Sequence, residues 1–187
     1  MPASHAATAW SGLVHIAWAS GTDARRTVLD RLLRDAGSPG DAVTHECPRC
    51  GSAAHGPLRT SSGTTVLSLS HAGDLTAGAI ARADAAASVG IDIEADRGSA
   101  PLTELAALFA PREPPTLREW TMIEAVVKAD GRGLRIAPAD IRFEGSLARI
   151  AGRSPIEVAE IEAPSGYVIS VAIDPVRPSR RGRGSDR

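Results

Sequence analysis

Several residue types are scarce in this sequence or missing from it, and each absence excludes a class of protein. Lysine occurs once, at Lys128, among 21 basic residues, and asparagine and glutamine do not occur. There are only two cysteines, Cys47 and Cys50, so the fold does not rest on a disulfide framework. No apolar run is long enough to span a membrane, and the first residues lack the pattern of a secretion signal. We therefore expect a cytoplasmic protein with no membrane partner.

The composition that remains is that of a globular protein with an unusual C-terminal end. With 187 residues, 43% of them hydrophobic, the chain can form a sizeable core in one or two small units. Residues 175–187 contain five arginines and one aspartate, whereas the whole chain has a net charge of −1. We expect a disordered basic tail there, although such tails can also contact nucleic acid or acidic partners. Because the rest of the chain is acidic, we expect no nucleic-acid partner.

Residues 89–94 alternate apolar and acidic side chains, as expected for a strand with one buried face. Ile91 and Ile93 then point into a core, while Asp92 and Glu94 lie side by side on the other face. Two neighbouring carboxylates repel each other unless a cation lies between them, and Mg²⁺ prefers such oxygen ligands. The alternative is a solvated polar face on an edge strand.

A second segment, residues 116–131, predicts a helix that carries Trp120, Glu124 and Lys128 in one stripe, at positions i, i+4 and i+8. The simple interpretation of this stripe is a surface Glu–Lys pair. However, a solvated helix face would accept arginine, which this chain uses everywhere else. The single lysine therefore suggests that a compact ammonium is required at this position.

The periodicity and the turn residues predict the remaining elements. Asp23 is a plausible N-cap for a helix that ends at Ala36, with Val28, Leu29, Leu32 and Leu33 as its apolar stripe. A further helix is expected over 101–109. Strands are expected over 13–19, 64–70, 76–81, 88–94, 141–143, 147–150, 157–162 and 167–173, with a hairpin turn at 71–74.

The segment from His45 to Pro57 contains a Cys-x₂-Cys pair with nearby histidines. Cys47, Cys50, His45 and His55 could in principle supply four zinc ligands. A second half-site with normal spacing is absent, so structural zinc is the less favoured interpretation.

Taken together, these motifs resemble those of the Sfp-type 4′-phosphopantetheinyl transferases. The family pattern Gly-x-Asp-x-Glu corresponds to 90–94, and Trp-x-x-Lys-Glu-x-x-x-Lys corresponds to 120–128. A Ser-His pair precedes the first motif at Ser70 and His71, and Gly-x-Gly-Leu follows the second at 131–134. The resemblance extends from about Arg25 to Ile173. It implies an α+β fold in which two similar halves, 1–85 and 86–174, form a pseudo-dimer with the active site between them.

The resemblance also implies an activity, in which 4′-phosphopantetheine is transferred from coenzyme A to a serine of an apo carrier protein, with release of 3′,5′-ADP. It implies a Mg²⁺ cofactor, and we expect a monomer. The implied metal ligands are Asp92, Glu94 and Glu124. The implied catalytic residues are Glu124, Lys128 and His71. The implied coenzyme-binding residues are Arg26, Thr27, Gly56, Ser70, His71 and Lys128. Apolar residues near Leu105–Phe109 are candidates for docking the carrier.

One position departs from the family pattern. The lysine that precedes the catalytic glutamate in the family is Ile123 here, which removes a positive charge from the coenzyme site. We expect Ile123 to border the catalytic stripe, about 100° round the helix from Glu124, so that Ile123→Lys should lower the KM for coenzyme A. The competing view is that Ile123 is buried in the core, in which case the substitution should destabilise the fold. Two rival functions remain open at this point: a transferase-like protein that binds coenzyme A or a carrier without turnover, and a small zinc-binding interaction module.

Overall fold

The computed structural model describes residues 4–47, 49–54 and 56–177, which form a mixed α+β fold of antiparallel sheets and few helices, as predicted. The strands are β1 (His5–Ala9), β2 (Val14–Ser20), β3 (Val43–His45), β4 (Leu58–Thr60), β5 (Thr65–Ala72), β6 (Leu75–Arg82), β7 (Ala86–Ala95), β8 (Arg142–Glu144), β9 (Leu147–Arg149), β10 (Ile156–Ile161) and β11 (Tyr167–Pro175). The helices are α1 (Ala24–Asp35), α2 (Ala106–Phe109) and α3 (Leu117–Asp130). Short 3₁₀ turns are η1 (Trp10–Gly12), η2 (Thr103–Leu105), η3 (Gly133–Arg135) and η4 (Pro138–Asp140).

The first sheet belongs to the N-terminal half and has the strand order β1-β2-β6-β5, with every pair antiparallel. Helix α1 covers one face of it, because the apolar stripe of the helix, including Val28 and Leu32, packs on Leu67 and Ile80 of the sheet. Strands β3 and β4 form a separate two-stranded sheet.

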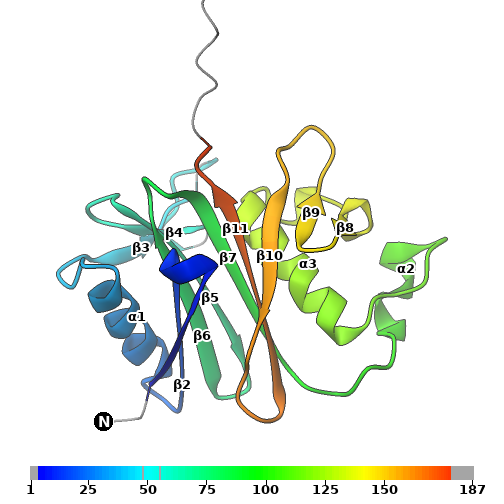
Figure 1. Ribbon diagram of the computed structural model, residues 1–187, viewed down its shortest axis with the longest axis horizontal. Helices are drawn as coiled ribbons and strands as arrows, with labels where there is room; N and C mark the ends of the chain where they lie inside the picture. Colours follow the sequence, from blue (N-terminus) through cyan, green and yellow to red (C-terminus); the bar gives the residue numbers. More distant parts are fainter. Residues whose placement is uncertain (1–3, 48, 55, 178–187) are drawn as a thin grey trace, which may run out of the picture.

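The second sheet belongs to the C-terminal half and has the strand order β7-β11-β10-β9-β8, again antiparallel throughout. Helix α3 packs on it through Ala125, Val126 and Ala129, which share a core cluster with Val158 and Ala172 of the strands. In Figure 1, α1 and α3 lie on opposite sides of the molecule with the strands between them.

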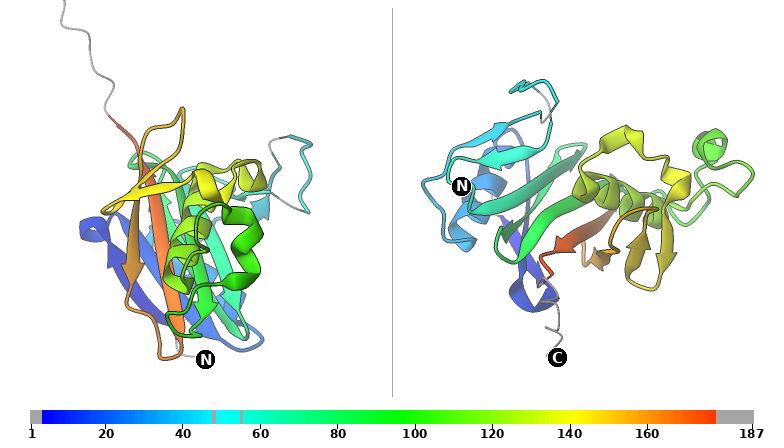
Figure 2. Two further views of the ribbon diagram at one scale, coloured as in Figure 1. Left: turned by 90° about the vertical axis from the view of Figure 1, so that its right-hand side faces the viewer. Right: turned by 90° about the horizontal axis from the view of Figure 1, so that it is seen from above.

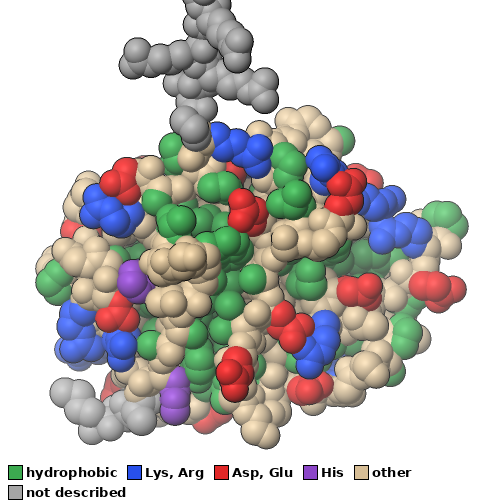
Figure 3. Space-filling model, in the orientation of Figure 1, with side chains coloured by type: hydrophobic (Ala, Val, Ile, Leu, Met, Phe, Trp, Pro, Cys, Tyr) green, Lys and Arg blue, Asp and Glu red, His purple; other side chains and the backbone are tan. Residues whose placement is uncertain are grey.

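A third core cluster joins the two sheets. It contains Ile16 and Ala79 from the first sheet and Ile91 and Val171 from the second, all of them fully buried. Hydrophobic side chains are visible in the middle of the face shown in Figure 3, where the strands lie. The views in Figure 2 show the same layering and also show the α2 segment projecting from the body of the molecule.

The edge strands β5 and β7 are in contact where the two sheets meet. Side chains make part of this junction, because the Ser68 hydroxyl accepts a hydrogen bond from the backbone N–H of Ile91 at 3.3 Å. One edge N–H of β7 is thereby satisfied by the other half of the molecule. The candidate functional site lies along this junction.

The strands and helices follow the predictions closely, with three differences. Strand β5 continues through His71 to Ala72, because Gly73 has a φ of 58° and allows a tighter hairpin turn than expected. The predicted helix over 101–109 is mostly wrong, since only 106–109 are α-helical and Pro101 pairs with Thr116 in an isolated β-bridge. Strands β1, β3 and β4 were not predicted, because β1 is alanine-rich and the other two have three residues each.

The C-terminal end of the chain is described as far as residue 177. Strand β11 continues to Pro175, the first residue of the predicted tail, and residues 178–187 of that tail lie outside the described part. Among the described residues, no helix has the length and apolar character needed to cross a membrane.

Candidate functional site

Helix α3 is capped at both ends by residues that favour helix termini. At its start the Thr116 side chain accepts a hydrogen bond from the N–H of Glu119 at 3.3 Å, and Glu119 Oε2 accepts one from the N–H of Thr116 at 2.7 Å. This reciprocal capping box fixes the first turn. The helix ends at Gly131, whose φ of 77° suits a residue without a side chain. The predicted bounds of this helix are therefore confirmed.

Gly90 allows α3 to lie directly on β7. A Cβ atom at this position would lie 2.0 Å from the carbonyl oxygen of Ala125 and 2.6 Å from the backbone nitrogen of Ala129. Only glycine permits this approach of helix backbone to strand backbone. As a result Asp92, on the same face of β7, also lies beneath α3 and is only 5% exposed. A solvated polar face on β7 is thus ruled out.

Asp92, Ser70 and Lys128 form a closed hydrogen-bonded network. Asp92 Oδ1 accepts hydrogen bonds from Lys128 Nζ at 2.7 Å and from Ser70 Oγ at 2.9 Å. Lys128 Nζ also donates to Ser70 Oγ at 2.9 Å and to the carbonyl oxygen of Ile91 at 3.0 Å. The Lys128 side chain is 30% exposed and that of Asp92 is 7% exposed. A surface Glu–Lys pair therefore does not describe Lys128, whose ion-pair partner is a buried aspartate.

The other oxygen of Asp92 has no partner. Asp92 Oδ2 and Trp18 Nε1 are the two buried side-chain polar atoms of the described residues that lack a hydrogen bond. An unpaired carboxylate oxygen in a buried position carries a large desolvation cost. A bound cation would remove that cost.

Glu94 and Glu124 are electrostatically coupled to Asp92. Burial raises the pKa of Glu124 above its ordinary value, and the charges of Asp92 and Glu94 raise it further, whereas Lys128 lowers it. Burial followed by the charge of Asp92 also raises the pKa of Glu94, against the opposing charges of Arg97 and Lys128. The three carboxylates from β7 and α3 are thus close enough to repel one another.

The donor chemistry of these carboxylates fits a hard divalent cation such as Mg²⁺, which is commonly held by one or two carboxylates. The unpartnered Asp92 Oδ2 offers one ligand atom, and Glu94 and Glu124 offer others. In the described part of the chain, however, no three Asp, Glu, His or Cys side chains are already arranged as a closed metal-binding group. Any metal site here would be completed by movement of these side chains or by ligand atoms from a substrate.

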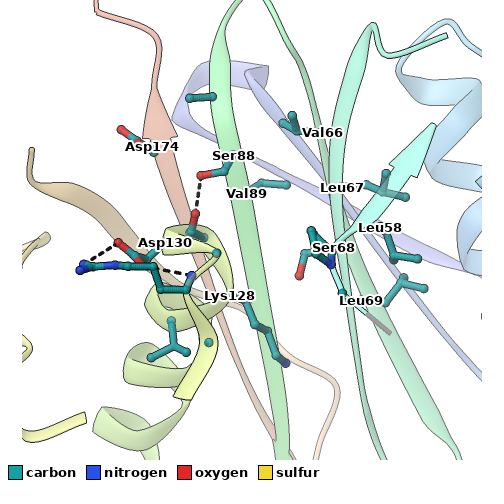
Figure 4. Close-up of a pocket in the computed structure, with 18 of the residues that line it drawn as sticks. Leu58, Val66, Leu67, Ser68, Leu69, Ser88, Val89, Lys128, Asp130 and Asp174 are labelled. Carbon is teal, nitrogen blue, oxygen red and sulfur yellow. Dashed lines mark hydrogen bonds and ion pairs between the residues drawn. The ribbon is translucent and has the colours of Figure 1, made fainter. Parts of the chain in front are cut away.

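A cleft of about 750 Å³ lies between the two halves and reaches Glu124 and Lys128. Its apolar lining includes Leu58, Leu67 and Leu69 from the N-terminal half and Val89 from β7. Figure 4 shows these residues around the cleft, with Lys128 extending from α3 across β7. The lining contains five Arg or Lys residues and three Asp or Glu residues, so it is net positive although the chain as a whole is net negative. Such a cleft suits an anionic ligand.

Only some of the predicted coenzyme-binding residues line this cleft. Gly56 and Lys128 line it, and at the start of α1 the lining residue is Arg25, not Arg26 or Thr27. The Arg26 side chain is 84% exposed and lies 3.8 Å from Asp30 in a surface ion pair.

Ser70 and His71 are neighbours on β5, but their side chains point to opposite faces of the strand. Ser70 points to Asp92, whereas His71 is exposed and does not join the network. The structure therefore brings together Ser70, Lys128 and the carboxylates, and leaves His71 on the other face of β5.

Ile123 belongs to the core of the C-terminal half. It is 4% exposed and packs in the cluster that contains Phe109 and Ile141. The expectation that it borders the site is wrong, because one residue along α3 from Glu124 the helix already faces the interior. A lysine at this position would be placed in apolar surroundings.

The segment proposed for carrier docking is covered at its two ends and exposed between them. Phe109 is 1% exposed and makes an edge-on contact with Trp120, at 6.4 Å between ring centroids. Leu105 is partly buried against the same cluster, whereas Leu108 is 52% exposed. Ala106, Ala107 and Leu108 remain available to a partner, and Leu108 is the large hydrophobic residue among them.

The segment around the cysteines is held by backbone contacts. Gly56 packs against Cys47, since a Cβ atom on Gly56 would lie 2.7 Å from Cys47 Cα, and its carbonyl oxygen lies 2.8 Å from His45 Nδ1. His55 lies outside the described residues, so the arrangement of the four possible zinc ligands is not described.

Sequence reasoning missed a second charged cluster at the C-terminal end of α3. The Asp130 side chain is fully buried and accepts hydrogen bonds from Arg132 Nε at 2.6 Å and Nη2 at 3.0 Å. Arg153 Nε lies 3.0 Å from the other side of the same carboxylate. Burial raises the pKa of Asp130, but the two arginines outweigh it and hold the pKa below its ordinary value. The Asp-x-Arg spacing was the only local signal, because Arg153 comes from a distant segment.

Comparison of the chain with models of known protein families and with curated protein sequences finds no match.

Proposed function

We propose that this protein is a 4′-phosphopantetheinyl transferase of the Sfp type, which transfers the phosphopantetheine arm of coenzyme A to a serine of an apo carrier protein. One observation carries the proposal: a buried aspartate with an unpartnered oxygen, coupled to two glutamates whose pKa values are raised, beside a net-positive cleft. This combination suits a phosphate-bearing ligand that binds with a divalent cation.

The topology supports the family fold that the motifs imply. In the N-terminal half the chain runs from β2 through α1 to β5 and β6, with β6 between β2 and β5 in the sheet. In the C-terminal half it runs from β7 through α3 to β10 and β11, with β11 between β7 and β10. The two halves therefore follow the same path, as expected for a pseudo-dimer with its site at the junction.

In the proposed reaction the serine hydroxyl of the carrier attacks the phosphorus that bears the pantetheine arm, and the bond from that phosphorus to 3′,5′-ADP breaks. Glu124, on the cleft wall with a raised pKa, is the candidate general base for the hydroxyl proton. Asp92, Glu94 and Glu124 would hold Mg²⁺, which when bound neutralises charge on the diphosphate. Lys128 adds a positive charge at the same end of the cleft.

A second candidate is a related protein that binds coenzyme A without turnover. It is favoured by the contacts of Lys128, whose ammonium donates hydrogen bonds to three protein oxygens. No N–H of this group is then left to stabilise a leaving phosphate.

The two candidates are separated by incubating the protein with coenzyme A, Mg²⁺ and a panel of apo carrier proteins, and then weighing the carriers. We expect one carrier to gain the mass of phosphopantetheine on a serine. Asp92→Asn, which keeps the shape of the side chain, should slow this transfer at least a hundredfold, about 2.7 kcal/mol. Asp84→Asn, at an exposed aspartate of the N-terminal half, is the matched control. Coenzyme A binding with no mass gain on any carrier would favour the second candidate.

A further inference from the structure

The network around Asp92 connects three elements that are distant in the sequence. Ser70 is on β5 in the N-terminal half, Asp92 is on β7, and Lys128 is on α3. Each of the three side chains contacts the other two, at 2.7 to 2.9 Å. The orientation of Asp92 therefore depends on a residue from the opposite half of the molecule.

A count of donors and acceptors shows what the network leaves available. An ammonium has three N–H donors, and Lys128 directs hydrogen bonds to Ser70, Asp92 and the carbonyl oxygen of Ile91. The Ser70 hydroxyl uses its one proton on Asp92 Oδ1 and accepts from Lys128. Asp92 Oδ1 receives two hydrogen bonds and Oδ2 receives none. The network thus leaves one buried carboxylate oxygen open.

We propose that Ser70 is a positioning residue, which together with Lys128 holds Asp92 Oδ1 so that only Oδ2 is presented to the cation. The hydroxyl of Ser70 serves the aspartate and not the coenzyme. This inference rests on the proposed function, because it requires that Asp92 bind a divalent cation.

Ser68 provides a built-in comparison. It lies two residues before Ser70 on the same face of β5 and also hydrogen-bonds to β7, but its partner is the backbone N–H of Ile91. Removing the Ser68 hydroxyl costs one hydrogen bond between the halves, whereas removing the Ser70 hydroxyl costs two, one to Asp92 and one from Lys128. Only the loss of the Ser70 hydroxyl frees the carboxylate of Asp92 to turn.

The test is a calorimetric titration of the full-length protein with Mg²⁺ alone, for the parent, Ser70→Ala and Ser68→Ala. Loss of a hydrogen bond to a charged group should raise the dissociation constant for Mg²⁺ about tenfold in Ser70→Ala. In Ser68→Ala the same constant should stay within about twofold of the parent value. A thermal melt of each variant, without metal, checks that all three are folded.

A second titration, with coenzyme A in the absence of Mg²⁺, separates the two roles of Ser70. We expect the parent and Ser70→Ala to bind coenzyme A equally, whereas weaker binding by the variant would assign the hydroxyl to the coenzyme and overturn the inference. Equal Mg²⁺ affinity in the parent and Ser70→Ala would also overturn it, and would leave the proposed transferase function standing. If the parent binds no Mg²⁺, the metal requirement of the proposed function fails first.

Discussion

The two halves of the molecule share one chain path but differ in where they place polar residues. In the N-terminal half, β2 is apolar where it is buried, and the fully buried side chains of α1 that pack on the sheet are aliphatic. In the C-terminal half, β7 places Asp92 beneath α3, and α3 ends at the buried Asp130. Both buried carboxylates of the described residues therefore lie in the C-terminal half.

The ion pairs of the two helices show the same difference. On α1, Arg26 and Asp30 form an i, i+4 pair with exposed side chains, and Arg31 and Asp35 form another that is partly exposed. Such pairs contribute a few tenths of a kcal/mol. Lys128 of α3 instead extends to strand β7 and forms an ion pair with the buried Asp92. The same chain path thus carries exposed ion pairs on the helix of one half and a buried ion pair beneath the helix of the other.

The largest effect is expected where the helices meet the sheets. Gly90→Ala would drive a Cβ atom into the backbone of α3, so the helix must shift, and we expect a loss of about 4 kcal/mol or more in unfolding free energy. In the N-terminal half, Gly78→Ala meets only the side-chain ends of Leu69, Leu32 and Val28, at 2.5 to 2.8 Å. These side-chain ends can rotate, so the unfolding free energy should fall by about 1–3 kcal/mol. Urea denaturation of both variants gives the comparison, and equal losses would contradict it.

A lysine at position 123 comes next. Because Ile123 is buried in the core of the C-terminal half, Ile123→Lys should lower the unfolding free energy by about 3 kcal/mol and should not improve coenzyme A binding. The matched variant on α1 is Leu29→Lys, at a half-buried position where the long side chain can reach solvent, and we expect a loss of about 1 kcal/mol or less. Tighter coenzyme A binding by a fully stable Ile123→Lys variant would contradict this expectation and would place position 123 beside the coenzyme.

Exchanging arginine and lysine tests the two kinds of ion pair. Lys128→Arg replaces a compact ammonium, which has three close oxygen partners, with a wider planar group. We expect kcat for transfer to fall at least tenfold, about 1.4 kcal/mol. Arg31→Lys on α1 changes a surface pair and should leave kcat unchanged. Unaltered kinetics in Lys128→Arg would remove the special requirement for lysine.

The smallest effect is a pH dependence that belongs to the C-terminal half. The pKa of Glu124 is raised in the folded state, so ionised Glu124 destabilises the metal-free protein at neutral pH, and that cost disappears as pH falls through the raised pKa. Glu124→Gln should therefore melt at a higher temperature than the parent at pH 7, and the difference should shrink towards pH 4. Asp130→Asn should behave in the opposite way, because the lowered pKa of Asp130 stabilises the fold above its ordinary pKa and that contribution is lost in acid. Melting curves from pH 3 to 8 test both signs.

Several elements of the fold can be predicted from local signals in the sequence. The apolar stripe of α1, the capping residues Thr116 and Glu119, and the glycine at 131 specify two long helices at nearly their observed bounds. Alternating residues specify the second part of β7, and a nearly continuous apolar run specifies β11. The two acidic residues of β7 and the lone lysine of α3 each mark their own element as a candidate part of a site. These features depend on neighbours within one element, so they can be predicted without knowledge of the fold.

Which residues contact one another could not be predicted from such local signals. Ile123 and Glu124 are adjacent in the sequence, yet one faces the core and the other the cleft. Ser70 and His71 are adjacent on β5, yet only Ser70 reaches Asp92. The partners of Asp130 are Arg132 and Arg153. The ion-pair partner of Lys128 is Asp92 on strand β7, and not Glu124, which lies one turn earlier on the same helix. Such contacts depend on the distance at which α3 packs on β7 and on the junction of two sheets, which no single segment encodes.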